Sequence, residues 1–227
     1  MSPIALAGGN EFRRECDPMD RALIELAGGA GVSVAILPTA ATNENPYVAG
    51  EAGIRQFRRL GARPDKLMIV DEQSANQVDL VGALVDFPFV YFTSGDPIYL
   101  HDTLLGSRAW EVVRTIHQRG GLVAGSSAGA MVLGAQLWRF DGWVPGLGLA
   151  PGLAVLPHHA TLAARWNGPA MAASLPAGVT LVGIDEATAL LLPSGQVVGV
   201  GQVTIYGAGG PRAYGPGEQV ELQLKLE

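Results

Sequence analysis

At 227 residues, of which 48% are hydrophobic and only 16% charged, the chain is long enough to form one α/β domain with a full core. Its net charge of −6 and its scattered Lys and Arg residues exclude the clustered basic surface of a nucleic-acid-binding protein. Its one cysteine, Cys16, excludes an intrachain disulfide and a cysteine-based metal cluster.

The N-terminal segment is apolar but lacks the basic region of a secretory signal, and residues 4–7 are predicted to form a strand. No apolar run reaches the ~18 residues that are needed to span a bilayer. We therefore expect a cytoplasmic protein without a membrane partner.

From this strand to residue 138, short apolar runs alternate with amphipathic stretches. Strands are predicted at 4–7, 32–37, 67–70, 89–93 and 121–124, and helices at 17–27, 46–60, 76–84, 107–119 and 130–138. Asp17-Pro18 and Gly28-Gly29 are typical start and stop signals of the first helix. Strands that alternate with helices of this length indicate parallel βαβ units and a doubly wound, mostly parallel α/β sheet.

The pattern changes in the last third of the chain. Strands are predicted at 153–156 and 179–184, a hairpin at 189–192 and 197–200, and antiparallel closing strands at 203–206 and 220–224. No low-complexity linker or internal repeat divides the chain, so we expect a single domain over residues 1–227.

Ser127 stands at the centre of Gly125-Ser126-Ser127-Ala128-Gly129, between a predicted strand and a predicted helix. Gly-x-Ser-x-Gly in this context is typical of a nucleophile elbow, a sharp turn that exposes the serine hydroxyl. The spacing selects Ser127 rather than Ser126, because both glycines lie two residues from Ser127. The alternative is a small-residue turn that only packs closely or binds phosphate.

Polar residues also follow other predicted strands, as Ser94-Gly95-Asp96, His158-His159 and Asp185-Glu186. Open α/β sheets bind ligands at the carboxyl ends of their strands, so we expect these clusters and Ser127 on one edge of one sheet. Together they supply the nucleophile, imidazole, carboxylate and backbone N–H groups of a serine hydrolase.

The order of these residues separates two kinds of serine hydrolase. The α/β-hydrolases place the acid between the serine and the histidine, and Asp141 is the only acid between Ser127 and His158. The order Ser127, His158, Glu186 fits the chain better. A metal site at the histidine pair is disfavoured because adjacent side chains diverge and no short-range ligand set completes it, so we expect no metal and no cofactor.

Several segments resemble peptidase family S51, which contains dipeptidase E and cyanophycinase. The segments are Ala7-Gly8-Gly9-Asn10-Glu11, Phe92-Thr93-Ser94-Gly95-Asp96, Gly125-Ser126-Ser127-Ala128-Gly129-Ala130, Pro157-His158 and Gly183-Ile184-Asp185-Glu186-Ala187-Thr188-Ala189. The resemblance implies a class I glutamine amidotransferase-like, flavodoxin-like fold and a homo-oligomer. It implies Ser127 as nucleophile and His158 as base.

The third member of the triad differs between branches of the family. The cyanophycinase pattern implies Glu186, the dipeptidase E pattern implies Asp141, and Asp185 is a further alternative. The resemblance also implies that the backbone N–H groups of Gly95 and Ala128 stabilise the oxyanion.

The expected substrate is a short peptide. Asp96, His159 and Arg165 are the expected substrate-binding residues, with Arg165 placed to receive a carboxylate. Cyanophycinases carry several Arg residues after the histidine, whereas the segment 160–164 is mostly apolar here, which disfavours that polymer.

We therefore predict a serine peptidase that acts on short peptides, including aspartyl dipeptides, through an acyl-enzyme. The alternatives are a cyanophycinase-like hydrolase, an esterase or amidase, and a non-catalytic metabolite-binding module on the same fold.

Overall fold

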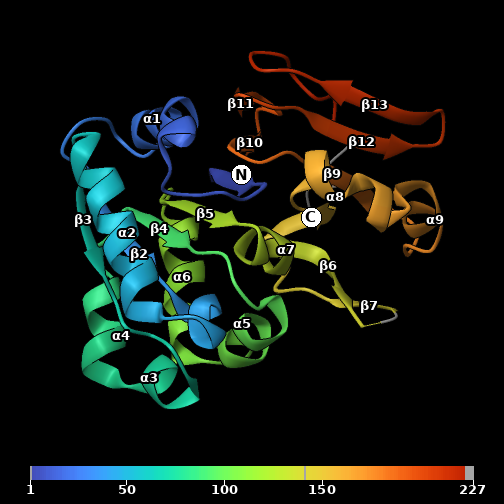
Figure 1. Cartoon of the computed structure of the whole chain (residues 1–227). Coiled ribbons are helices and arrows are strands. Elements are labelled where there is room, and N and C mark those ends of the chain that lie inside the picture. The colour runs from blue at the N-terminus through green and yellow to red at the C-terminus, as the bar shows by residue number, and fades with distance from the viewer. Residues whose placement is uncertain (1, 141, 223–227) are drawn as a thin grey trace.

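The computed structural model describes residues 2–140 and 142–222, which form two β-sheets (Figure 1). The first sheet contains β1 Ile4–Ala7, β2 Ser33–Leu37, β3 Arg63–Lys66, β4 Phe89–Phe92, β5 Leu122–Ser126, β10 Thr188–Leu192 and β11 Val197–Gly199. Its order is β11-β10-β1-β5-β4-β2-β3. The strands β1 to β5 are parallel, and β10 and β11 extend the sheet beyond β1 in antiparallel pairing.

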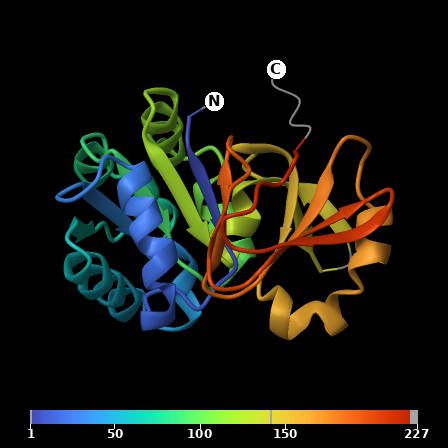
Figure 2. The same cartoon turned by 90° about the horizontal axis from the view of Figure 1, so that it is seen from above.

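The second sheet is built from strands that follow β5 in the chain. It contains β6 Gly134–Arg139, β7 Gly142–Pro145, β8 Ala150–Leu156, β9 Thr180–Ile184, β12 Val203–Gly207 and β13 Gly210–Tyr214. Its order is β13-β12-β9-β8-β6-β7, with β6, β8 and β9 parallel to one another and the other pairs antiparallel. Figure 2 shows the two sheets in two adjoining halves of the molecule.

Helices cover both faces of the first sheet. The helices of the described residues are α1 Asp17–Leu26, α2 Pro46–Arg59, α3 Glu72–Asn76, α4 Val78–Leu84, α5 Pro97–Leu104, α6 Arg108–Gln118, α7 Ala128–Leu133, α8 His159–Trp166 and α9 Gly168–Ala173, with short 3-10 helices η1 Arg14–Cys16 and η2 Thr39–Asn43. In Figure 1, α1 to α6 gather around the parallel strands, whereas α8 and α9 lie against the second sheet. Within the described residues, none of these helices is long and apolar enough to cross a bilayer.

The core has two layers because successive residues of a strand point to opposite faces. Ile4 and Leu6 of β1 pack into the cluster that contains α4 to α7, and Ala5 and Ala7 pack into the cluster under α1 and α2. Burial on both faces is what the continuous apolar runs of parallel strands predict.

The fold class expected from the sequence is confirmed: a mostly parallel α/β core with antiparallel strands towards the C-terminus. The expectation of a single sheet is wrong. The chain leaves the first sheet after β5, builds the second sheet, and returns to the first with β10 and β11 before it finishes in the second.

The helix predicted over 130–138 ends at Leu133, and residues 134–139 form β6 instead. Gly134 ends the helix, and the following segment forms a hairpin with β7 in which Trp138 and Trp143 are opposite each other, with ring centroids 5.1 Å apart. Cross-strand aromatic pairing of this kind overrides the local helical pattern.

Three other boundaries differ from the prediction. The third strand lies at Arg63–Lys66 rather than 67–70, because an edge strand tolerates Pro64 and charged residues while the apolar residues after it pack into the core as a loop. The predicted helix 76–84 corresponds to α4, Val78–Leu84, and a separate short helix, α3, precedes it at Glu72–Asn76. Residues 220–222 of the predicted closing strand are not in a strand, 223–224 lie outside the described residues, and β13 provides the closing strand instead.

Candidate active site

Ser127 lies in a sharp turn between β5 and α7. Its φ of 49° and ψ of −107° are strained for a residue with a side chain, at a typical cost of about 1–3 kcal/mol. A Cβ on Gly125 would lie 2.3 Å from the backbone of Gly129, and one on Gly129 would lie 2.7 Å from the carbonyl oxygen of Phe92. Both glycines of the motif are therefore required by close packing around the turn.

The turn sends its two hydroxyls in different directions. Ser126 is fully buried and donates a hydrogen bond to Glu11 Oε2 at 2.9 Å, whereas Ser127 retains 9% exposure. The Ser127 Oγ lies 3.1 Å from Nε2 of His158. The structure thus distinguishes the two serines in the way that the motif spacing predicts.

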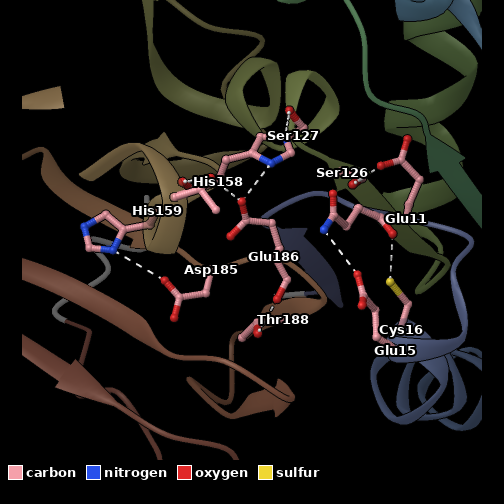
Figure 3. Close-up of polar contacts among 12 residues, drawn as sticks. Glu11, Glu15, Cys16, Ser126, Ser127, His158, His159, Asp185, Glu186 and Thr188 are labelled. Atoms are coloured by element: carbon pink, nitrogen blue, oxygen red, sulfur yellow. Dashed lines mark hydrogen bonds and ion pairs between the residues drawn. The ribbon is translucent and has the colours of Figure 1, made fainter. Parts of the chain in front are cut away.

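His158 joins the serine to a carboxylate. Its Nδ1 lies 3.3 Å from Oε1 of Glu186, so that Ser127, His158 and Glu186 form one chain of hydrogen-bonding groups (Figure 3). Thr161, one turn along α8, donates a further hydrogen bond to the same Glu186 oxygen at 2.5 Å.

Glu186 is held in its ionised form. Burial raises the pKa of Glu186, but hydrogen bonds from Thr161, its own backbone N–H and His158 outweigh burial, and the pKa lies below its ordinary value. An ionised carboxylate at this position accepts a hydrogen bond from the imidazole and fixes its orientation.

The backbone of the Gly8-Gly9 pair approaches the site very closely. The carbonyl oxygen of Gly8 accepts a hydrogen bond from the His158 N–H at 2.7 Å, and a Cβ on Gly8 would lie 2.1 Å from the carbonyl oxygen of Asp185. A Cβ on Gly9, whose φ is 121°, would lie 2.3 Å from the imidazole ring of His158. These two glycines leave the space that the histidine and the acid loop occupy.

Ser127, His158 and Glu186 come from both sheets, which corrects the expectation that they share one edge of one sheet. Ser127 follows β5 of the first sheet, and His158 follows β8 of the second. Glu186 lies in the connection from β9 of the second sheet to β10 of the first. The candidate site therefore lies where the two sheets meet.

The expected oxyanion residues flank this site. Gly95 follows β4 with a φ of 141°, and a Cβ there would lie 2.0 Å from the carbonyl oxygen of Ala40, so only glycine fits. Ala128 is the first residue of α7, a position whose N–H has no acceptor within its own helix.

Two of the expected substrate-binding residues, Asp96 and Arg165, are not hydrogen-bonded to Ser127, His158 or Glu186 in the described part of the chain. The Asp96 Oδ1 caps α5 by accepting from the N–H groups of Ile98 and Tyr99, and its Oδ2 accepts from Asn43 at 3.2 Å. Arg165 is exposed on α8. Contact of Arg165 with substrate stays a prediction.

His159 belongs to a second polar cluster beside the triad. Its Nε2 lies 2.7 Å from the Tyr206 hydroxyl, and its Nδ1 lies 3.5 Å from Oδ1 of Asp185. Figure 3 shows His159 directed toward Asp185, away from the triad, so neighbouring histidines pair with neighbouring acids. Asp185 is therefore not the partner of His158, and Asp141 lies outside the described residues.

The sequence did not assign a role to two residues that the structure brings into this region, Glu11 and Thr161. Glu11 accepts hydrogen bonds from Ser94 and Ser126, and Thr161 contacts Glu186. A signal existed for Thr161, because residues three apart on a helix share a face, so Thr161 lies beside His158. For Glu11 the signal was its place just after a strand end.

A strained serine hydrogen-bonded to an imidazole that is in turn held by a carboxylate defines the site of a serine hydrolase. The sequence model of "Peptidase family S51" matches residues 4–199. The chain belongs to peptidase family S51 and is a serine peptidase, which confirms the resemblance seen in its motifs.

Two solved structures are similar to the whole chain. A crystal structure of a peptidase from an acI-B1 Actinobacterium is 30% identical, with a TM-score of 0.86 over 98% of this chain and 97% of that one. A putative peptidase E protein from Listeria monocytogenes EGD-e is 17% identical, with a TM-score of 0.64 over 95% of this chain and 98% of that one, and supports the fold. No curated protein matches the chain significantly.

Proposed function

We propose that the protein hydrolyses short peptides through a Ser127-His158-Glu186 triad and an acyl-enzyme. The observation that carries the proposal is the chain of contacts from Ser127 Oγ to His158 Nε2 at 3.1 Å and from His158 Nδ1 to Glu186 Oε1 at 3.3 Å. A hydroxyl becomes an effective nucleophile when a positioned base accepts its proton during attack.

In the acylation step, Nε2 of neutral His158 accepts the Ser127 proton as Oγ bonds to the peptide carbonyl carbon. Glu186 holds the ring with Nδ1–H toward the carboxylate and stabilises the imidazolium that forms. The imidazolium then gives its proton to the leaving amine as the C–N bond breaks. In deacylation, neutral His158 accepts a proton from the water molecule that attacks the acyl carbon. The imidazolium then gives this proton to Ser127 Oγ as the ester bond breaks and the carboxylic acid product leaves.

The backbone N–H groups of Gly95 and Ala128 are the proposed donors to the oxyanion. Their positions beyond the ends of β4 and β5 support this role, because these two strands are adjacent in the first sheet. Loss of one such donor typically lowers kcat by about 10²–10³-fold.

The proposed substrates are short peptides, and aspartyl dipeptides are the first to test. Arg165, exposed on α8 beyond His158, supports a peptide with a free carboxylate, since guanidinium and carboxylate form paired hydrogen bonds. A library of dipeptides and tripeptides, with and without an N-terminal Asp, identifies the preferred side chains.

The catalytic role of Ser127 is tested with a fluorophosphonate, which labels only an activated serine, and with the peptide library. We expect the wild-type protein to be labelled and Ser127→Ala to lose labelling and at least ~10⁴-fold of turnover. A variant with full turnover would contradict the assignment of Ser127 as nucleophile. A wild-type protein that is neither labelled nor active on the library would contradict the proposal and favour a non-catalytic binding module.

The acid is identified by comparing Glu186→Gln, Asp185→Asn and Asp141→Asn. Replacing a triad acid by its amide costs roughly 10⁴-fold in kcat in the serine proteases, and we expect a loss of that order only for Glu186→Gln. A large loss in Asp141→Asn with Glu186→Gln active would move the triad to the dipeptidase E arrangement.

A further inference from the structure

Glu11 connects the two segments that lead into the proposed oxyanion donors, Gly95 and Ala128. Its Oε1 accepts hydrogen bonds from the Ser94 backbone N–H at 2.8 Å and from the Ser94 hydroxyl, and its Oε2 accepts from the Ser126 hydroxyl at 2.9 Å. Ser94 directly precedes Gly95, and Ser126 directly precedes Ser127. Figure 3 shows the contact between Ser126 and Glu11. One carboxylate thus joins the loop after β4 to the last residue of β5, directly before the turn at Ser127.

Glu11 makes these contacts close to the point where the strand pairing of the first sheet ends. The ladder between β4 and β5 ends with Phe92 opposite Gly125, and the ladder between β1 and β5 ends with Ala7 opposite Ser126. Beyond these pairs, the spacing between Gly95 and Ala128 depends on contacts between side chains and loops. Glu11 contacts Ser94 in the loop after β4 and Ser126 at the end of β5.

The segment that carries Glu11 is itself held firmly. Asn10 and Phe12, on either side of Glu11, both have positive φ values, 60° and 66°, which persist only when the surroundings fix the backbone. The Asn10 carbonyl oxygen accepts a hydrogen bond from Cys16, and the Phe12 ring packs 5.3 Å from the Tyr91 ring. Glu11 is therefore anchored on the body of the first sheet rather than on either loop.

The charge of Glu11 does not itself favour the reaction. A negative group behind the oxyanion donors opposes the negative charge that develops on the substrate carbonyl oxygen. The hydrogen bonds from Ser94 and Ser126 offset part of this charge. The benefit of Glu11 to the reaction therefore comes from the positions in which it holds these two serines.

We propose that Glu11 is a positioning residue that sets the distance between the oxyanion donors Gly95 and Ala128 by bridging Ser94 and Ser126. This inference rests on the proposed function, because it needs Ser127 to be the nucleophile and these two N–H groups to be the donors. A displacement of about 1 Å in a catalytic group can cost ~10²-fold in rate, so the bridge has a measurable effect.

The test measures the second-order rate of labelling by a fluorophosphonate, whose phosphoryl oxygen occupies the oxyanion site, in the purified full chain. We expect Glu11→Ala to be labelled ~10²-fold more slowly than the wild-type protein. We expect Glu11→Gln to lose about tenfold or less, because its amide oxygen still accepts from Ser94. Glu15→Gln, an acid of the same segment that contacts Asn10, is the charge control and should label at the wild-type rate.

A double-mutant cycle separates positioning from a general loss of structure. If Glu11 acts through Ser126, the single variant Ser126→Ala is labelled more slowly than the wild-type protein, but the same substitution slows labelling little further when Glu11→Ala is already present. If the two residues act independently, the two rate losses multiply. On a peptide substrate, the Glu11 variants should lower kcat and leave KM nearly unchanged.

The outcomes distinguish failure of this inference from failure of the proposed function. A wild-type protein that is not labelled, or Ser127→Ala labelled as fast, overturns both. If the wild-type protein is labelled and Glu11→Ala is labelled at a rate within threefold of it, only the role of Glu11 is overturned. Equal losses of labelling rate in Glu11→Gln and Glu11→Ala also overturn that role, because they would show that the charge of Glu11 matters rather than its geometry. If Glu11→Ala does not fold, the test rests on Ser126→Ala. Labelling of that variant at the wild-type rate would overturn the proposal that Glu11 acts by bridging Ser94 and Ser126.

Discussion

The imidazole of His158 lies against the backbone of Gly9, and this contact explains a glycine that a turn alone does not require. The space for a Cβ at Gly9 is occupied by the ring, with its Cε1 2.3 Å away. The positive φ of 121° adds a second restriction, because residues with a side chain rarely adopt it. The two effects can be separated by experiment.

We expect Gly9→Ala to displace the His158 ring and to lower kcat by ~10²-fold or more, since a shift of about 1 Å disrupts the contact with Ser127. Gly28→Ala is the matched control. Gly28 has a similar φ of 125° but nothing within 4 Å of an added Cβ, so this variant carries the backbone strain without the contact. Equal kcat values in the two variants, measured on the best substrate of the library, would show that the contact has no catalytic effect.

Much of the turn around Ser127 could be predicted from the sequence because its requirements are local. Gly125 and Gly129 lie in contact with each other within one turn, so their spacing alone indicates the conformation of Ser127. Glu11 and Thr161 could not be assigned a role, because their partners are distant in sequence: 83 and 115 residues for Glu11 and 25 for Thr161.

At the scale of single elements, helix α1 carries a buried acid into the interface with the first sheet. Asp20 is fully buried, its Oδ2 accepts from Gln56 at 2.7 Å, and its Oδ1 has no hydrogen-bond partner in the described part of the chain. Burial raises the pKa of Asp20 to about 7, against an ordinary value of 3.8, and the nearby carboxylates of Asp17 and Glu11 add to the rise.

This raised pKa predicts how stability changes with pH. The folded protein binds the Asp20 proton more tightly than the unfolded chain, so the contribution of Asp20 to stability falls as pH rises from about 4 to about 7. We expect the stability of Asp20→Asn relative to the wild-type protein to increase by a few kcal/mol between pH 4 and pH 8.

The measurement is urea unfolding at several pH values, with Glu25→Gln as a control. Glu25 is an exposed acid of the same helix, so its replacement should change stability little at any pH. A constant difference between Asp20→Asn and the wild-type protein across this range would show that Asp20 does not titrate in the folded state.

The helices and parallel strands up to β5 could largely be predicted, because their apolar periodicity follows from burial on known faces. Strands β8 to β12 were also predicted close to their observed bounds, whereas β3, β6, β7 and β13 were not. Trp138 lies in a strand because it pairs with Trp143 across a hairpin, and β3 is an edge strand without an apolar run. In both cases pairing with another segment, rather than local pattern, decides the structure.

At the scale of the whole molecule, the two sheets cannot be assigned to two consecutive stretches of the chain. The chain passes from the first sheet to the second after β5, returns at β10, and leaves again after β11. Leu6 of β1, Val182 of β9 and Val203 of β12 belong to one hydrophobic cluster. The candidate site draws Ser127 and His158 from opposite sides of this junction, so its geometry depends on both sheets being folded.

We therefore predict that the protein unfolds in a single cooperative transition, as one domain over residues 1–227. A calorimetric enthalpy equal to the van't Hoff enthalpy would indicate this behaviour. Tryptophan fluorescence gives a more specific measurement, because Trp110 lies in α6 beside the first sheet while Trp138 and Trp143 lie in the second. Variants that retain only Trp110, or only Trp138 and Trp143, should report coincident midpoints in urea. Separate midpoints, with the second sheet unfolding first, would show two independent units, and His158 would then lose its partner Ser127 before the first sheet unfolds.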